Sequence, residues 1–368
     1  MLSIKTLSLQ QFKNYTSAKV TLCPQVNCFT GKNGAGKTNV LDAIYYLSFT
    51  KSYFNAQDAQ NVQHNLDYFS IKADYDRNEL TEQALLHYQK GKKTLKINNN
   101  EVKKFSEHIG QYPLVMITPN DIMLLHEGSE ERRRFLDGMI SQLDKFYLND
   151  LLLYNRTVEQ RNKQLRLFAE GMPVDYNLLD SYNALLVKHG QALFTKRTQF
   201  LANFISVFNQ FYQRIAQSQE QVNIVYQSDL LHQNFDELLA KQTSNDVAAQ
   251  RTTKGIHKDE LEFTISNYPI KKFGSQGQQK SFIISLKLAQ YAYLKNQTQT
   301  KPLLLLDDIF EKLDEHRLNT LLQMMAQDEF GQIFITDTHL PRLQQVFNTM
   351  QNVQVKYFTV NQGTINEL

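Results

Sequence analysis

The chain has 368 residues, of which 42% are hydrophobic and 21% charged, and its net charge is +3. This composition is typical of a globular protein with one large or two medium domains, in which nucleic acid could bind only at a local basic patch. Cys23 and Cys28 are too few for a disulfide framework or a thiolate metal site. The first residues lack the apolar core of a signal peptide, and no apolar run approaches 18 residues. We therefore expect a soluble cytoplasmic protein.

The segment 31–38 fills every fixed position of the phosphate-binding loop G-x-x-x-x-G-K-[ST]. Residues 26–30 before it are predicted to form a strand, and residues 39–47 after it a helix with one apolar face. Glycines let the backbone fold around an anion, so that amides and the helix N-terminus point at phosphates. The predicted ATP-binding residues are Gly31, Lys32, Asn33, Gly34, Ala35, Gly36, Lys37 and Thr38. We expect Lys37 to reach the β- and γ-phosphates and the Thr38 hydroxyl to bind Mg²⁺.

An apolar run at 301–306 ends in Asp307 and Asp308. It is predicted to be a buried parallel strand that delivers two carboxylates to the ligand-binding edge of a sheet. Asp307 would hold Mg²⁺ through water, and Asp308 would orient or deprotonate the attacking water, which makes Asp308 and Lys37 the candidate catalytic residues. The alternative is an ordinary strand after which Asp308 starts a helix.

Two shorter motifs lie on either side of that strand. Ser275, Gly277 and Gln278 open a predicted helix that runs to about residue 293, with Ser275 as the N-cap, so free amides and the positive dipole end point outward. Asp314 closes a Leu-Asp pair shortly after the acidic strand. Taken alone, these motifs could be a capped amphipathic helix and a charged helix start.

Together the four motifs have the order of an ATP-binding-cassette ATPase: phosphate loop, distant signature, acidic strand and Leu-Asp loop. In that class the signature of one subunit caps the γ-phosphate held by the other, so ATP joins two protomers. We therefore predict an α/β fold, a P-loop ABC-type ATPase head with mixed β-sheets plus an inserted mainly helical subdomain. Residues 1–118 and 251–368 would form the ATPase lobe, and residues 119–250 the helical lobe.

Several segments spread over the whole chain resemble the RecF family, a group of bacterial ATPases related to structural-maintenance-of-chromosomes proteins. The segments that carry the resemblance are 12–15 (FKNY), 119–122 (PNDI), 132–137 (RRRFLD), 154–162 (YNR…QRN) and 275–280 (SQGQQK). The segment 255–261 (GIHKDEL) departs from the family's GPHRDDL. There Ile256 removes a rigid proline, and Lys258 replaces a forked guanidinium with a point charge.

The resemblance implies a protein of recombinational repair and replication restart. It implies a weak, DNA-stimulated ATPase whose ATP-dependent homodimer binds DNA at junctions between duplex and single-stranded gaps. The implied partners are RecR, with RecO and RecA loading downstream. Two alternatives stay open: an ATP-gated scaffold with negligible hydrolysis, and an ABC-type ATPase subunit of another system, such as a transporter.

The residues themselves support DNA binding only moderately. Basic clusters occur at 90–96, 103–104, 132–134 and 271–272, but such clusters are more often solvated faces. The three arginines at 132–134 cannot all face one way on a helix, so at least one is expected to have a structural partner. Cassette ATPases place a switch histidine after the strand that follows the acidic strand; His339 lies slightly too late for a clean match to that γ-phosphate role, and a turn or helix-cap role is favoured. No role is assigned to His257.

Overall fold

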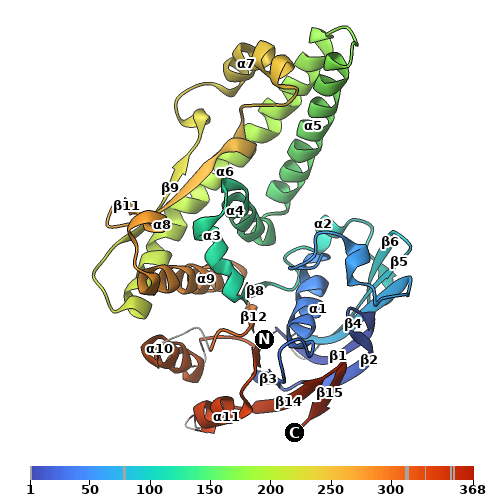
Figure 1. Ribbon diagram of the computed structural model, residues 1–368, viewed down its shortest axis with the longest axis vertical. Helices are drawn as coiled ribbons and strands as arrows, with labels where there is room; N and C mark the ends of the chain where they lie inside the picture. Colours follow the sequence, from blue (N-terminus) through green and yellow to red (C-terminus); the bar gives the residue numbers. More distant parts are fainter. Residues whose placement is uncertain (1, 78–79, 311–314, 328, 349, 351–352) are drawn as a thin grey trace. The chain divides into compact units, whose positions relative to one another are not determined.

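The computed structural model describes residues 2–77, 80–310, 315–327, 329–348, 350 and 353–368. The chain folds into two compact units (Figure 1). The first comprises Met1–Asp121, Arg214–Gln217 and Ile283–Leu368, and the second Ile122–Gln213 and Ser218–Phe282. Within the described residues, no helix has the length and apolar character needed to cross a bilayer.

The first unit contains a six-stranded sheet in which every neighbouring pair is antiparallel. Its order is β2-β1-β4-β5-β6-β7. The strands are β1 (Leu2–Phe12), β2 (Tyr15–Thr21), β4 (Tyr68–Arg77), β5 (Leu80–Gln89), β6 (Lys92–Ile97) and β7 (Asn100–Glu101). Burial alternates along these strands, as in β4, where Phe69, Ile71 and Ala73 are buried. One face of the sheet is therefore core and the other faces solvent.

The second sheet of this unit has a parallel centre, in the order β15-β14-β3-β13-β12-β8, and only β14 and β15 pair antiparallel. The strands are β3 (Val26–Thr30), β8 (Leu114–Ile117), β12 (Leu303–Leu306), β13 (Ile333–Asp337), β14 (Val355–Asn361) and β15 (Thr364–Glu367). Strands β3, β8, β12 and β13 are buried along their whole length. Uninterrupted burial is what a parallel sheet covered on both faces requires.

Helix α1 (Lys37–Phe49) joins the two sheets into one core. Its Val40, Ile44 and Leu47 are fully buried, as their helical spacing predicts, and they pack in one cluster with residues of both sheets. Both cysteines, Cys23 and Cys28, are buried and free. Other helical elements of this unit are η1 (Asp58–Asn61), α2 (Phe105–His108), α10 (Glu315–Ala326) and α11 (Leu340–Asn348), with most of η2 (Pro119–Ile122) and the part of α9 (Gln276–Thr298) from Ile283 onward.

The second unit is mainly helical and has a small antiparallel sheet, β9-β10-β11. Its elements are α3 (Met123–His126), α4 (Ser129–Leu143), α5 (Lys145–Ala169), α6 (Tyr176–Ala216), β9 (Val222–Gln227), η3 (Asp229–Leu231), α7 (Phe235–Ala249), η4 (Ile256–Lys258), β10 (Glu260–Ile265), β11 (Tyr268–Pro269), α8 (Ile270–Phe273) and the start of α9 (Gln276–Thr298). A fully buried Arg161 on α5 pairs with Asp246 on α7 at 2.7 Å and bonds Asn183 on α6 at 3.1 Å. This buried network ties the three helices together.

The predicted fold class is confirmed, because the chain combines mixed sheets with a mainly helical unit. The predicted boundary at residue 250, between the helical lobe and the ATPase lobe, is wrong for one segment. Residues 251–282 belong to the helical unit and not to the ATPase lobe, since β10 pairs along its full length with β9, which lies inside the helical stretch. The signature motif therefore also begins in the second unit.

Candidate functional site

The phosphate loop connects the C-terminal end of β3 to the first turn of α1. Gly36 adopts φ 113°, a left-handed conformation that side chains rarely allow, and a Cβ at this position would meet the side chain of Asn14. Gly34, with φ 78°, also needs glycine's freedom. These two glycines give the loop its tight curvature, and the helix N-terminus that follows has free amides.

The turn between β1 and β2 holds the phosphate loop through side-chain hydrogen bonds. Asn14 donates from Nδ2 to the carbonyl oxygen of Ala35 at 2.9 Å and accepts from the Asn39 side chain at 2.7 Å. The Tyr15 hydroxyl donates to the carbonyl oxygen of Gly36 at 2.9 Å. Two loop carbonyls are thus occupied by side chains of a distant hairpin. Sequence reasoning noted this turn only as part of a resemblance and missed its role.

Lys37 lies folded against its own loop. Its Nζ donates to the carbonyl oxygens of Gly31 at 2.9 Å and Lys32 at 3.3 Å, and the residue is only 4% exposed. The ammonium group is therefore held among the loop's carbonyls at the start of α1. A cation fixed in this position can bind phosphate oxygens without a large movement of the backbone.

The structure brings Thr38 and Asp307 together, although they are 269 positions apart in the sequence. The Thr38 hydroxyl donates to Oδ1 of Asp307 at 2.9 Å. The hydroxyl of Thr336, near the end of β13, donates to the same oxygen at 2.7 Å. The phosphate loop, β12 and β13 therefore present their side chains at one edge of the parallel sheet, where α/β folds bind ligands. Thr336 is a further member of the site that the sequence did not single out for this position.

The two aspartates differ in environment. Burial raises the pKa of Asp307 above its usual value and the neighbouring Asp308 carboxylate raises it further, while the hydroxyls of Thr336 and Thr38 oppose the shift. Asp308 is half-buried, adopts φ 46°, and its backbone N–H donates to the Thr336 hydroxyl at 2.9 Å. A left-handed aspartate directly after a buried strand is a strained position of the kind found at functional sites. No helix starts at Asp308 itself.

The group of oxygens around Thr38 and Asp307 suits Mg²⁺. This ion is usually held by one or two protein oxygens, substrate phosphates and water, not by an all-protein cage. The described part of the chain contains no cluster of three or more His, Cys, Asp or Glu residues that could hold a metal ion. A hydroxyl and a carboxylate within hydrogen-bonding distance fit the implied ion.

The signature turn at the start of α9 is closed by its own side chains. The backbone N–H of Gln278 bonds Oγ of Ser275 at 3.2 Å, and Oε1 of Gln278 accepts from the backbone N–H of Ser275 at 2.7 Å. Ser275 is thus the predicted N-cap, in a reciprocal capping arrangement. Nε2 of Gln278 donates to Glu220 at 2.7 Å. No sequence signal pointed to Glu220, which follows α6. Gly277 lies in the same turn, and Ser275 is exposed.

The sequence analysis also named Asp314, His339 and His257. Asp314 of the Leu-Asp loop lies outside the described residues. His339 is exposed, and its backbone N–H donates to Asp337 at 2.7 Å just before α11, which fits the favoured turn or cap role. His257 lies in the second unit, where its ring contacts the Tyr154 hydroxyl at 2.9 Å and the Thr252 carbonyl at 3.2 Å. Both histidines therefore have local structural partners.

The basic cluster 132–134 is fully engaged within the second unit. Arg132 pairs with both oxygens of Glu260 at 2.7 and 2.8 Å, and Arg133 donates to the carbonyl oxygen of Asp259. Arg134 pairs with Glu130 and Glu131 on its own helix. The expectation that at least one arginine is structural holds for all three. This cluster is therefore not a free surface for nucleic acid.

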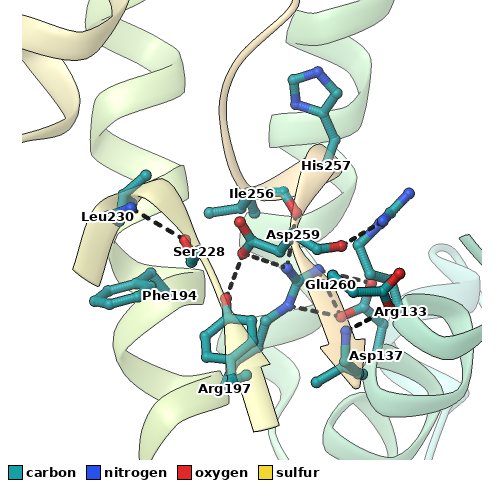
Figure 2. Close-up of polar contacts among 12 residues, drawn as sticks. Arg133, Asp137, Phe194, Arg197, Ser228, Leu230, Ile256, His257, Asp259 and Glu260 are labelled. Atoms are coloured by element: carbon teal, nitrogen blue, oxygen red, sulfur yellow. Dashed lines mark hydrogen bonds and ion pairs between the residues drawn. The ribbon is translucent and has the colours of Figure 1, made fainter. Parts of the chain in front are cut away.

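Arg133 also borders a buried polar centre built around Arg197 of α6 (Figure 2). The Arg197 guanidinium binds both oxygens of Asp137 at 2.9 and 3.0 Å and the carbonyl oxygen of Ile256 at 3.0 Å, and lies 3.4 Å from Asp259. Burial raises the pKa of Asp259 to about 6. The centre joins α4, α6 and the segment before β10, so the departure of residues 255–261 from the family pattern falls beside this buried polar centre of the second unit.

Comparison with known proteins first defines the class. The family model described as RecF/RecN/SMC N terminal domain matches residues 3–366. The chain also resembles the Smc head domain of Pyrococcus furiosus, with a TM-score of 0.55 at 14% identity over all of this chain and 96% of that one, which shows a shared fold. The fold and the phosphate-loop edge thus place this chain among the ATPase heads of the RecF/RecN/SMC class.

The chain belongs to the RecF family of DNA replication and repair proteins. It is 48% identical to RecF of Flavobacterium johnsoniae over 93% of this chain and 96% of that protein, and 42% identical to RecF of Bacteroides thetaiotaomicron over 99% and 98%. It also matches a solved structure of RecF–ATPrS, a recombination mediator protein of the RecFOR pathway. That match has a TM-score of 0.89 and 28% identity, and covers 100% of this chain and 98% of that one.

Proposed function

We propose that this chain is an ATP-dependent DNA-binding protein of recombinational repair and replication restart. Its ATP-driven dimer would bind junctions between duplex and single-stranded gaps. The observation that carries the proposal is the 2.9 Å contact between Thr38 and Asp307, which closes the phosphate loop on the acidic strand in a member of the RecF family. A solved relative is described as RecF–ATP, which supports ATP as the nucleotide.

In this proposal the phosphate loop holds the triphosphate. The amides of residues 31–36 and the N-terminus of α1 bind phosphate oxygens, and Lys37 exchanges its contacts with loop carbonyls for the β- and γ-phosphates. Thr38 and Asp307 would hold Mg²⁺, Asp307 through water, and the ion would supply positive charge to the phosphate oxygens.

Hydrolysis would follow from the position of Asp308. Its carboxylate orients a water that attacks the γ-phosphorus, the bond to the bridging oxygen breaks, and ADP and phosphate leave. Ser275, Gly277 and Gln278 of the partner protomer, with the Leu-Asp loop that contains Asp314, would complete the site in trans. Hydrolysis would be weak, stimulated by DNA, and would reset the dimer.

The proposed partners follow from family membership. A relative is named as a recombination mediator of the RecFOR pathway. We therefore propose that RecR binds the DNA-bound dimer, that RecO acts downstream, and that the outcome is RecA loading on single-stranded DNA.

Analytical sedimentation tests the clamp directly. The protein would be run alone, with ATP and Mg²⁺, and with ATP, Mg²⁺ and a gapped duplex. We expect a shift to dimer with ATP and co-sedimentation with DNA. Lys37→Met should abolish both, because the β- and γ-phosphates lose a direct cationic partner. Lys241→Met, which removes an exposed lysine paired only with Glu237, serves as control. A Lys37→Met protein that still dimerises with ATP would contradict the assignment.

A single-turnover hydrolysis assay with and without DNA separates the proposed ATPase from an ATP-gated scaffold. A scaffold would dimerise with ATP yet release no phosphate over the lifetime of the complex. An ATPase would release phosphate, faster with DNA, and the dimer would then dissociate.

A further inference from the structure

The solvent face of the sheet β2-β1-β4-β5-β6-β7 carries a row of lysines that is invisible in the linear sequence. Strand register places Lys19 opposite Ser8, Ser8 opposite Lys72, Lys72 opposite Leu85, and Leu85 opposite Lys96. Directly opposed residues of an antiparallel pair point to the same face. The three lysines of β2, β4 and β6, here called the lysine row, therefore share one line across the sheet.

The dimensions of the lysine row suit a polyanion. Neighbouring strands lie about 4.8 Å apart, so successive lysines are roughly 10 Å apart and the row spans about 20 Å. Over that length a DNA duplex carries on the order of ten phosphate charges on its two strands. A flat sheet face with three separated point charges can therefore meet several phosphates at once.

The three lysines of the row form no ion pair with the described residues of the protein. Among the residues that the structure describes, no carboxylate lies within 4.0 Å of the ammonium group of Lys19, Lys72 or Lys96. The contrast with nearby lysines is clear, because Lys93, which alternates to the opposite side of β6, pairs with Asp58 at 2.8 Å, and Lys5 pairs with Asp76 at 2.6 Å.

Two acids, Asp74 and Glu101, border the row, and within the described residues neither lies within ion-pairing distance of its ammonium groups, although Asp74 is close enough to interact with Lys72 and Lys19. Asp74 is bound by the Thr6 hydroxyl at 2.6 Å and by Gln83 at 2.9 Å. Partial burial raises the pKa of Asp74, but these hydrogen bonds and the nearby charges of Lys72 and Lys19 outweigh it. The net result is a pKa below the usual value for an aspartate. Glu101 stands opposite Lys96 on the short edge strand β7 and is exposed.

The neighbouring row on the same face is rich in hydrogen-bonding groups. Register joins five residues in line: Ser17, Gln10, Ser70, His87 and Thr94. Hydroxyl and amide groups of this kind contact phosphate and sugar oxygens in protein–DNA complexes. The face thus offers lysines flanked by hydrogen-bonding side chains.

We propose that this sheet face binds the phosphate backbone of duplex DNA, with the lysine row as its cationic core. The proposal rests on the DNA binding proposed above and names the surface for it. A duplex is favoured over a single strand because single-strand sites use exposed aromatic rings as stacking platforms. On this face the strand register offers only Tyr68, whose ring already packs against His87 at 5.7 Å.

The test compares two triple variants by fluorescence anisotropy with labelled duplex DNA over a range of salt concentrations. The row variant is Lys19→Gln/Lys72→Gln/Lys96→Gln. The control, Lys196→Gln/Lys241→Gln/Lys254→Gln, removes the same charge from ion-paired lysines of the second unit. Each lost phosphate contact lowers the slope of log K against log salt by about 0.9 in magnitude. We expect the row variant to lose about 2.7 in slope and on the order of tenfold or more in affinity, and the control to lose far less.

A gain-of-charge variant guards against misfolding as the cause. Leu85 lies in the row between Lys72 and Lys96 and is half-buried on the solvent face. Leu85→Lys should raise the magnitude of the slope of log K against log salt by about 0.9, the value for one phosphate contact, and should tighten duplex binding. A row variant with an unchanged slope, equal losses in the two triples, or a row variant impaired only for single-stranded DNA would overturn the inference. If the wild type binds no DNA while still binding ATP, the proposed function fails instead.

Discussion

Lys287 of α9 and Asp121 after β8 form a buried ion pair, with 2.9 Å between Nζ and Oδ1 and side-chain exposures of 6% and 3%. The same aspartate accepts from the Tyr53 hydroxyl at 2.8 Å and from the backbone N–H of Thr118 at 2.7 Å. The backbone N–H of Tyr53 in turn donates to Asp42 of α1 at 2.7 Å. A continuous path of buried and half-buried polar contacts therefore joins the helix behind the phosphate loop to the helix that starts with the signature.

Breaking this pair on one side should be costly. Lys287→Met leaves the Asp121 carboxylate buried without its cation, and we expect a loss of about 3–5 kcal/mol in unfolding free energy by urea titration. The double variant Lys287→Met/Asp121→Asn removes the lone charge and should recover part of that loss. If both proteins unfold at the same urea concentration as the wild type, the pair does not contribute to stability.

Asp308 and Asp307 should differ in phenotype. Asp308→Asn keeps the Thr38–Asp307 contact and removes only the charge proposed to orient water. ATP binding and the ATP-dependent dimer should persist, and phosphate release should fall by about 100-fold or more. Asp307→Asn should weaken Mg²⁺-dependent ATP binding itself. Equilibrium binding with a fluorescent ATP analogue and a phosphate-release assay distinguish the two. Normal turnover in Asp308→Asn would refute its proposed role.

Ser275 should act on the partner's nucleotide. Ser275→Arg places a bulky cation at the exposed N-cap, so ATP binding by the monomer should remain near wild type while ATP-driven dimerisation is lost. Mixing Ser275→Arg with Lys37→Met protomers should restore at most one composite site. Sedimentation measures both outcomes. A normal ATP-dependent dimer of Ser275→Arg would argue against a shared site.

Glu220 should position the signature turn through Gln278. Glu220→Ala removes the acceptor at 2.7 Å, so Gln278 loses its anchor and the ATP concentration for half-maximal dimerisation should rise about tenfold. Glu220→Gln keeps an acceptor oxygen and should stay near wild type. The rescue by glutamine is the critical readout, because a general packing defect would not depend on that oxygen. Equal effects of both variants would point to charge instead.

His257 should make the protein sensitive to mild acid. Burial lowers the pKa of His257 to about 4, and the nearby charges of Lys258 and Arg133 add to this shift, while the hydrogen bond with the Thr252 carbonyl opposes it. The folded-state pKa lies below the unfolded value of about 6.5, so this stability is present above pH 6.5 and is lost as the pH falls. Between pH 7.5 and 5, the wild type should lose about 2 kcal/mol relative to His257→Gln.

Urea unfolding at the two pH values measures that difference. The pKa of Asp259 is raised to about 6, so its contribution has the opposite sign: it grows as the pH falls below 6. Because Asp259 is present in both proteins, its effect cancels in the comparison. A difference that does not change with pH would contradict the assignment of a neutral, buried His257.

Local sequence signals predicted the phosphate loop, the acidic strand and the capped signature helix, because each depends on residues close together in the chain. The meeting of Thr38 and Asp307 was also expected, since parallel strands deliver their ends to one edge. The lysine row could not be predicted, because it depends on the register of three strands. Nor could the support of the loop by Asn14, because nothing in a hairpin turn encodes the distant backbone that it will touch.

The Asn14 side chain fills the space that a Cβ at position 36 would need, and this limits how the two positions can change. A methyl group at position 36 would collide with the Asn14 side chain, and a smaller residue at position 14 would leave the Ala35 carbonyl without its donor. Even with room made, the left-handed backbone at position 36 would still disfavour a side chain. The two positions are therefore coupled: a side chain at position 36 and a smaller residue at position 14 should each weaken the phosphate loop.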